Sequence, residues 1–135
     1  METPPALTVG RVSCRPIAGG VQHPGDAGRW ACTWLLHNDG ASPLELIAAW
    51  IPHGRFRGDG RLPVSEAIGP GASRDLEFVV TANEPPLTVV ENAFLILRVR
   101  FGGAPWRVFI RMRIEFDSAA VPLPVVETIT TQSLE

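Results

Sequence analysis

Five arginines in two neighbouring segments form a dense group of like charges. Only Glu115 and Asp117 accompany them as acidic residues within residues 93–117. Because successive side chains of a strand point to opposite faces, the spacing predicts that all five project from one face of a sheet. Guanidinium groups held side by side repel one another unless carboxylates or an anionic ligand lie between them. The five are Arg98, Arg100, Arg107, Arg111 and Arg113.

Aromatic side chains alternate with these arginines, and such a mixture is typical of surfaces that bind other proteins. Phe94 and Phe109 are expected on the same face and would be its apolar anchors. The alternative is a solvated face balanced by acidic side chains of a third strand, with Glu45 as the candidate. The net charge of −2, from 12 basic and 14 acidic residues, argues against nucleic acid and membranes as partners. We expect a protein partner or self-association.

Two cysteines, Cys14 and Cys32, are candidate metal ligands or a redox pair. Each is expected on the apolar face of a strand, where cysteine packs as a small hydrophobic residue. Their separation of 18 residues lacks the short spacing of common zinc sites. We therefore expect two reduced thiols in the core, and no cofactor.

Three histidines, His23, His37 and His53, are expected in loops or at strand ends. A β-sandwich gathers its loops at two ends, so two of them could meet there, with a cysteine, to bind copper or zinc. No two have the i, i+2 or i, i+4 spacing of common metal motifs. Three solvated histidines are the simpler interpretation, and a small metal-binding protein is the alternative.

The chain lacks the common catalytic motifs. It has no Gly-x-Ser-x-Gly elbow, no phosphate-binding loop, no dinucleotide fingerprint and no His-Glu-x-x-His. A small enzyme would have to use a pocket at one end of the fold, with His53 and Asp59 as acid–base groups. We expect that the protein is not an enzyme.

Alternation of apolar and polar residues predicts the strands that position these side chains. Residues 106–116 alternate without a break, and Gly102-Gly103 is the expected turn to a partner strand at 93–101. Asn38-Asp39-Gly40 is expected to form another turn. Residues 53–61 are expected to form a Gly-rich loop. Further strands are expected at 7–17, 29–37, 44–51, 62–68 and 76–82.

Several aromatic residues are assigned by the same alternation. Trp30, Trp34 and Trp106 fall on predicted buried faces, with Trp50 as a further candidate, which favours core packing over a carbohydrate-binding platform. Phe56 lies in the expected loop, where it either packs back on the fold or contacts a partner. The neighbouring Arg57-Gly58-Asp59 is attributed to chance.

About seven strands joined by short turns predict an all-β fold, an immunoglobulin-like antiparallel β-sandwich. Turns and strands follow one another as Asn38-Asp39-Gly40, Ser42-Pro43-Leu44 and a Gly-Pro-Gly-Ala-Ser element at 69–73 before the strand around Phe78. This order resembles bacterial immunoglobulin-like modules of the fibronectin type III or CARDB (cell-adhesion-related) kind, over roughly residues 7–117. The resemblance implies a binding or structural module without catalytic residues.

The length of 135 residues fits one domain, predicted at 1–117 and followed by an extended C-terminal tail at 118–135. Val125, Ile129 and Thr130 give the tail strand character, so it could add a strand to an edge of this or another molecule. The first residues lack the basic and apolar regions of a secretory signal, which predicts a cytoplasmic protein. The predicted function is that of a non-catalytic protein-interaction or structural module.

Overall fold

A computed structural model describes residues 12–22 and 28–135 of the chain, and these residues form eight strands. No helix in this part of the chain is long and apolar enough to cross a membrane. The strands are β1 (Val12–Gln22), β2 (Arg29–Asn38), β3 (Leu44–His53), β4 (Phe56–Ile68), β5 (Ser73–Thr81), β6 (Val89–Phe101), β7 (Ala104–Phe116) and β8 (Pro122–Ser133).

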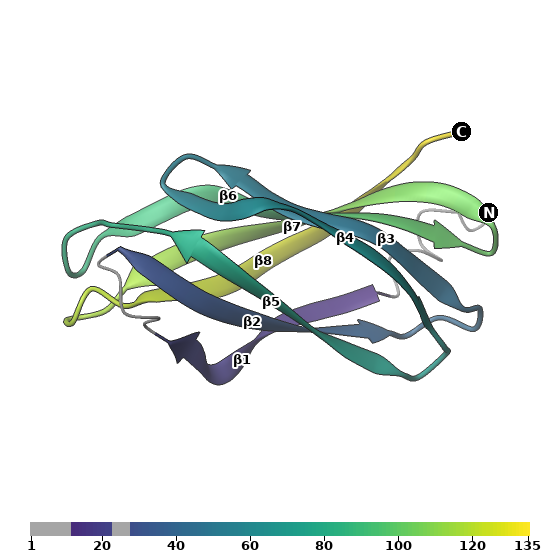
Figure 1. Ribbon diagram of the computed structural model, residues 1–135, viewed down its shortest axis with the longest axis horizontal. Coiled ribbons are helices and arrows are strands. Elements are labelled where there is room, and N and C mark those ends of the chain that lie inside the picture. The colour runs from purple at the N-terminus through teal and green to yellow at the C-terminus, as the bar shows by residue number, and fades with distance from the viewer. Residues whose placement is uncertain (1–11, 23–27) are drawn as a thin grey trace.

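The eight strands form one antiparallel sheet in the order β1-β2-β5-β4-β3-β6-β7-β8. The sheet curls so far that β1, β2 and β5 lie opposite β3, β6 and β7 (Figure 1). The two halves are joined through β4 and β5 by only two residue pairs, Arg57 with Thr81 and Gly58 with Val80. The all-β, antiparallel prediction is therefore confirmed, in a nearly closed sheet that has eight strands in the described residues rather than about seven.

Two predicted boundaries differ from the structure. The expected loop at 53–61 is wrong, because β3 turns directly into β4 and His53 pairs with Phe56. Phe56 is fully buried, so it packs back on the fold. Most of the segment predicted as a C-terminal tail lies on the sheet, where β8 pairs with β7 from Phe116 opposite Pro122 to Trp106 opposite Ser133.

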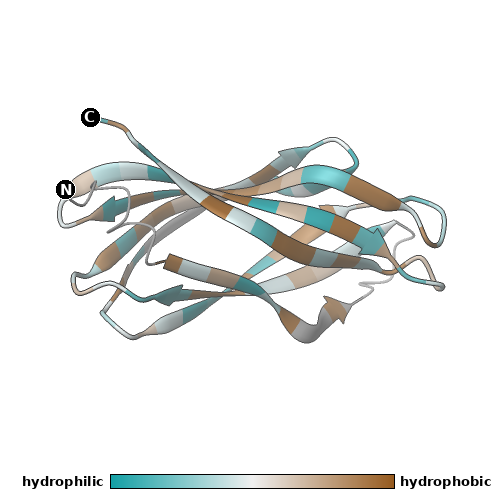
Figure 2. Cartoon of the chain, turned by 180° about the vertical axis from the view of Figure 1, so that it is seen from behind, coloured by the Kyte–Doolittle hydropathy of each residue, from teal (hydrophilic) through white to brown (hydrophobic). Residues whose placement is uncertain are grey.

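The core lies between the two halves of the curled sheet. Figure 2 shows hydrophobic and hydrophilic residues alternating along the strands, and the inward residues of β6 and β7 are almost completely buried. Trp34 packs edge-to-face against Phe56 and Phe78, with ring centroids 6.3 and 6.0 Å apart. Such pairs add to the free energy gained from burying the rings.

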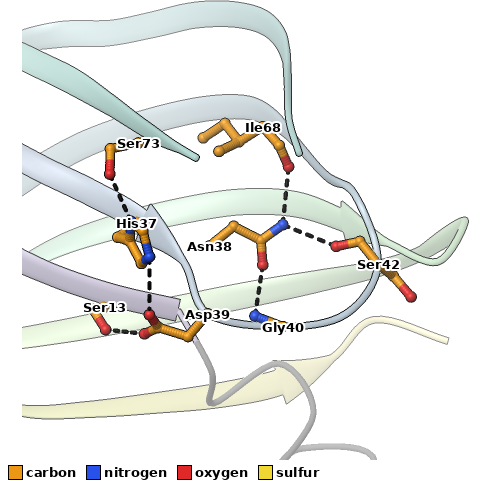
Figure 3. A network of polar contacts seen from close by, with 8 residues as sticks. All are labelled: Ser13, His37, Asn38, Asp39, Gly40, Ser42, Ile68 and Ser73. Atoms are coloured by element: carbon orange, nitrogen blue, oxygen red, sulfur yellow. Dashed lines mark hydrogen bonds and ion pairs between the residues drawn. The ribbon is translucent and has the colours of Figure 1, made fainter. Parts of the chain in front are cut away.

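The turn after β2 depends on Asn38, the only buried polar residue in the described part of the chain. Its amide nitrogen donates hydrogen bonds to the carbonyl oxygens of Ser42 (2.8 Å) and Ile68 (2.9 Å), and its amide oxygen accepts one from the Gly40 nitrogen (2.9 Å; Figure 3). A Cβ atom at Gly40 would lie only 2.9 Å from the Phe101 ring. The predicted Asn-Asp-Gly turn is thus fixed by the side chain of Asn38 and by close packing at Gly40.

The β6–β7 hairpin turns at Gly102 and Gly103, as the sequence predicts. Both residues have positive φ angles, of 60° and 85°. Two successive left-handed residues suit the tight turn that matches the twist of the flanking strands. This turn fixes the register that sets Arg98 opposite Arg107.

Candidate functional site

The five predicted arginines and two phenylalanines lie on one outward face. Register pairs place Phe94 opposite Arg111 and Arg98 opposite Arg107 on β6 and β7, and directly opposite residues point to the same side of a sheet. The intervening residues point into the core. We call this surface the arginine face. It consists of Phe94, Ile96, Arg98 and Arg100 of β6, Arg107, Phe109, Arg111 and Arg113 of β7, and Trp50 of β3.

Three of the five arginines are neutralised by carboxylates. Arg100 Nη1 lies 3.5 Å from Glu45 Oε1, on the strand where the sequence suggests a balancing acid. Glu127 of β8 lies between the other two, 3.7 Å from Arg111 and 2.8 Å from Arg113. Hydrogen bonds to Glu115 and Glu127 raise the pKa of Arg113. This part of the face matches the solvated, salt-bridged alternative.

The remaining two arginines face each other without a counterion. Arg98 and Arg107 are directly opposite on β6 and β7, and neither has an ion pair with any residue that the structure describes. The Nε atom of Arg107, like that of Arg111, is also buried without a hydrogen-bond partner there. Like charges in this arrangement destabilise a sheet, and a buried donor without a partner costs further free energy.

An apolar strip lies next to this charged pair. Trp50, Ile96 and Phe109 occupy one row across β3, β6 and β7. Phe94 packs edge-to-face against Phe109, with ring centroids 6.4 Å apart and planes at 87°. All four side chains are half-buried, so their exposed parts form a continuous apolar surface beside Arg98 and Arg107.

Trp50 joins this strip because β3 contains an irregularity. The strict alternation of Leu44, Leu46, Ala48 and Trp50 predicts that all four point inward, but the register shifts between Leu46 and Ala48. Beyond the shift, Ala49 and Ile51 point inward and Trp50 points outward. The adjacent pair of small residues, Ala48-Ala49, is the only feature of the sequence that could have indicated this.

The two cysteines are separate core residues. Both are buried and unbonded, and burial raises the pKa of each thiol to about 12. Cys14 lies opposite Leu36 on β2, four residues from Cys32, which corresponds to about 13 Å along a strand. That distance is too long for a disulfide.

The histidines do not converge on a metal site in the described part of the chain. His23 lies outside the described residues. His53 accepts a hydrogen bond from the Arg55 backbone nitrogen within its own turn. His37 contacts Ser73 and Asp39. Across residues 12–22 and 28–135, no three His, Cys, Asp or Glu side chains are grouped so that they could hold a metal ion.

The contacts of His37 form a polar network that the sequence did not suggest. His37 Nδ1 lies 2.6 Å from Ser73 Oγ, His37 Nε2 lies 3.2 Å from Asp39 Oδ1, and Ser13 donates to Asp39 (Figure 3). These are the residue types of a serine-hydrolase relay. Ser73 and Ser13 are the residues directly opposite His37 on β5 and β1, so the network links three adjacent strands. We assign it to the stability of this end of the sheet.

The sequence also suggested His53 and Asp59 as an acid–base pair, but each has a different partner in the structure. Asp59 forms an ion pair with Arg29 of β2, and it lies in β4 rather than in a loop. Gly58 is buried beside Ile51 and Phe78. The Arg57-Gly58-Asp59 tripeptide is therefore part of the link between the two halves of the sheet.

The described surface carries pockets at two places that bear on the predicted sites. One, of about 450 Å³, lies beside the Arg100–Glu45 pair at the β6–β7 turn. The other, of about 320 Å³, lies where β1 approaches β8.

Comparisons of the chain with protein-family models, with curated proteins and with solved structures find no match.

Proposed function

We propose that this protein is a non-catalytic interaction module that binds a protein partner through the arginine face. The observation that carries the proposal is the Arg98–Arg107 pair, which has no carboxylate partner among the described residues although three neighbouring arginines have one. A partner that brings carboxylates to this pair would remove the repulsion between the two guanidinium groups.

The apolar strip supports a protein partner over a small anion. Arginine, tryptophan and other aromatic residues are the side chains that contribute most to protein interfaces when they are desolvated together. Trp50 and Phe109 flank the charged pair on one side, so a partner could cover the apolar surface and pair with the guanidinium groups at once. A simple inorganic anion would use only the charges.

The charge of the face favours a different protein over a second copy of this chain. In a symmetric dimer the same surface is presented by both subunits. Arg98 and Arg107 lie in the middle of the face, so a symmetric contact centred there would bring four guanidinium groups together. An acidic patch on another protein has no such cost.

We also propose that the fold is a variant of the immunoglobulin-like sandwich. Strands β1, β2 and β5 would be one layer, and β4, β3, β6 and β7 the other, with β8 as an added strand beside β7. The two residue pairs between β4 and β5 are the only ladder between these layers in the described residues, which supports treating them as two sheets. The resemblance to bacterial fibronectin type III or CARDB modules and the cytoplasmic location remain proposals of the same kind.

The test is partner capture with the charges of the pair reversed. Wild-type protein and the double variant R98E/R107E are used as bait in a lysate of the source organism, and captured proteins are identified by mass spectrometry. The control is R57E, which reverses an exposed arginine of β4 that also has no ion pair among the described residues. Circular dichroism first verifies that each bait is folded.

The proposal predicts partners that are captured by wild type and by R57E but lost with R98E/R107E. Their capture should weaken as salt is raised, because the charged pair supplies part of the attraction. If the double variant captures the same proteins as wild type, the arginine face is not the binding surface.

A further inference from the structure

The seam between β1 and β8 contains a site that is independent of the arginine face. These strands are the two ends of the sheet order, so each presents one edge that is not paired in the ladder. The pocket between them has a volume of about 320 Å³. This lies within the range of cavities that bind small molecules.

An irregularity in β1 accounts for the pocket. Pro16 and Val21 pair with Trp34 and Cys32 of β2, so four residues of β1 lie opposite a single residue of β2, Thr33. A bulge of this kind bends a strand away from the regular ladder. The bend leaves a hollow next to β8, where a regular strand would have continued the sheet.

The composition of both edges disfavours an added strand in this hollow. Pro16 lines the pocket from β1 and Pro124 from β8, and Pro122 begins β8. Proline has no backbone N–H to donate, and proline and bulges on edge strands prevent pairing with another strand. The occupant is therefore expected to use side-chain contacts rather than backbone hydrogen bonds.

The lining indicates what such an occupant would look like. Among the described residues, seven line the pocket, and six of these are apolar: Pro16, Ile17, Val21, Val121, Leu123 and Pro124. Leu123 is 41% exposed and is one of three exposed large hydrophobic residues in the described part of the chain. The seventh is Arg15, which is exposed and has no ion pair with any described residue.

We propose that this pocket binds an apolar monocarboxylate, such as a medium-chain fatty acid. The guanidinium group of Arg15 presents parallel N–H donors that match the two oxygens of a carboxylate. The hydrocarbon chain covers Ile17, Val21 and Leu123 and removes their exposed surface from water. One charged residue and six apolar residues in the described lining define this ligand class by complementarity.

The test compares octanoate with 1-octanol, which has the same chain without the charge. Binding is followed by NMR titration of the methyl groups of Ile17, Val21, Val121 and Leu123. Wild type is expected to bind octanoate about fivefold more tightly than octanol, as befits one partly exposed charge-assisted contact. Arg15→Met should lower octanoate affinity to that of octanol and leave octanol unchanged, and Leu123→Asp should weaken both.

The matched control is Arg57→Met, which removes an exposed arginine of β4 that does not line the pocket. It should bind both ligands as wild type does. The proposal is overturned if octanoate shows no saturable shift of these methyl groups, or if Arg15→Met and Arg57→Met behave alike. It is also overturned if octanoate shifts the arginine face instead.

Discussion

Two polar regions of this sheet differ in whether their groups have partners. At the end of β2, Asn38 uses both amide hydrogens and its amide oxygen, and His37 uses both ring nitrogens. On the arginine face, Arg98 and Arg107 lack counterions in the described chain, and Arg107 Nε is buried without an acceptor. A saturated network, in which every polar group has a partner, stabilises the fold by itself. An unsaturated network, in which charged or polar groups lack partners, costs free energy that a binding partner can recover.

The largest expected effect is a loss of folding stability when Asn38 is removed from the saturated network. Asn38→Ala removes three side-chain hydrogen bonds and leaves the carbonyl groups of Ser42 and Ile68 and the Gly40 nitrogen without them. At about 1 kcal/mol for each bond, the free energy of unfolding should fall by about 3 kcal/mol. Urea denaturation monitored by tryptophan fluorescence measures it.

The control for this change is Gln132→Ala, which truncates an exposed amide of β8. It should leave the urea midpoint almost unchanged. A loss below about 1 kcal/mol for Asn38→Ala would mean that water replaces these bonds, and the contrast between the two regions would then have no energetic basis.

The sequence predicted the unsaturated region better than the saturated one. Residues 106–116 alternate so regularly that the register of β7, and with it the common face of Arg107, Phe109 and Arg111, follows from the pattern alone. His37 and Ser73 are 36 residues apart, and their contact depends on the pairing of β2 with β5. Such long-range pairing leaves no local signal.

Two other differences between the sequence-based predictions and the structure have local physical causes. Pro122 and Pro124 made the C-terminal segment resemble a tail, but proline is tolerated on the edge strand that β8 forms. This strand supplies Glu127, the acid that neutralises Arg111 and Arg113. Trp50 changed faces because the shift after Leu46 inverts the alternation, and a one-residue slip always does so.

The comparison of the two regions can be sharpened by removing a counterion from the arginine face. Glu127→Gln removes the carboxylate between Arg111 and Arg113, so that more of the arginine face lacks a counterion. Stability should fall slightly, because surface ion pairs contribute little. Capture of an acidic partner should become about two- to fivefold tighter, because the potential of the face rises. The partner from the capture experiment is titrated in a binding assay at two salt concentrations.

Glu66→Gln is the control for this variant, since it removes a carboxylate paired with Arg74 at 3.0 Å outside the arginine face. Its effect on stability should be similar and its effect on partner affinity absent. If both variants bind alike, the net charge of the protein sets the affinity and the local arrangement does not.

A change in stability of the opposite sign is expected for Arg107→Met. Methionine keeps most of the hydrocarbon stem on the face that also carries Phe109, but it removes the charge facing Arg98 and the buried Nε donor. The free energy of unfolding should rise by about 0.5 to 1 kcal/mol, while partner affinity falls. Thermal unfolding and the same binding assay measure both quantities on one sample. A variant that loses stability would show that the arginine is held by contacts within the fold, and its place on the face would then be explained by structure rather than by binding.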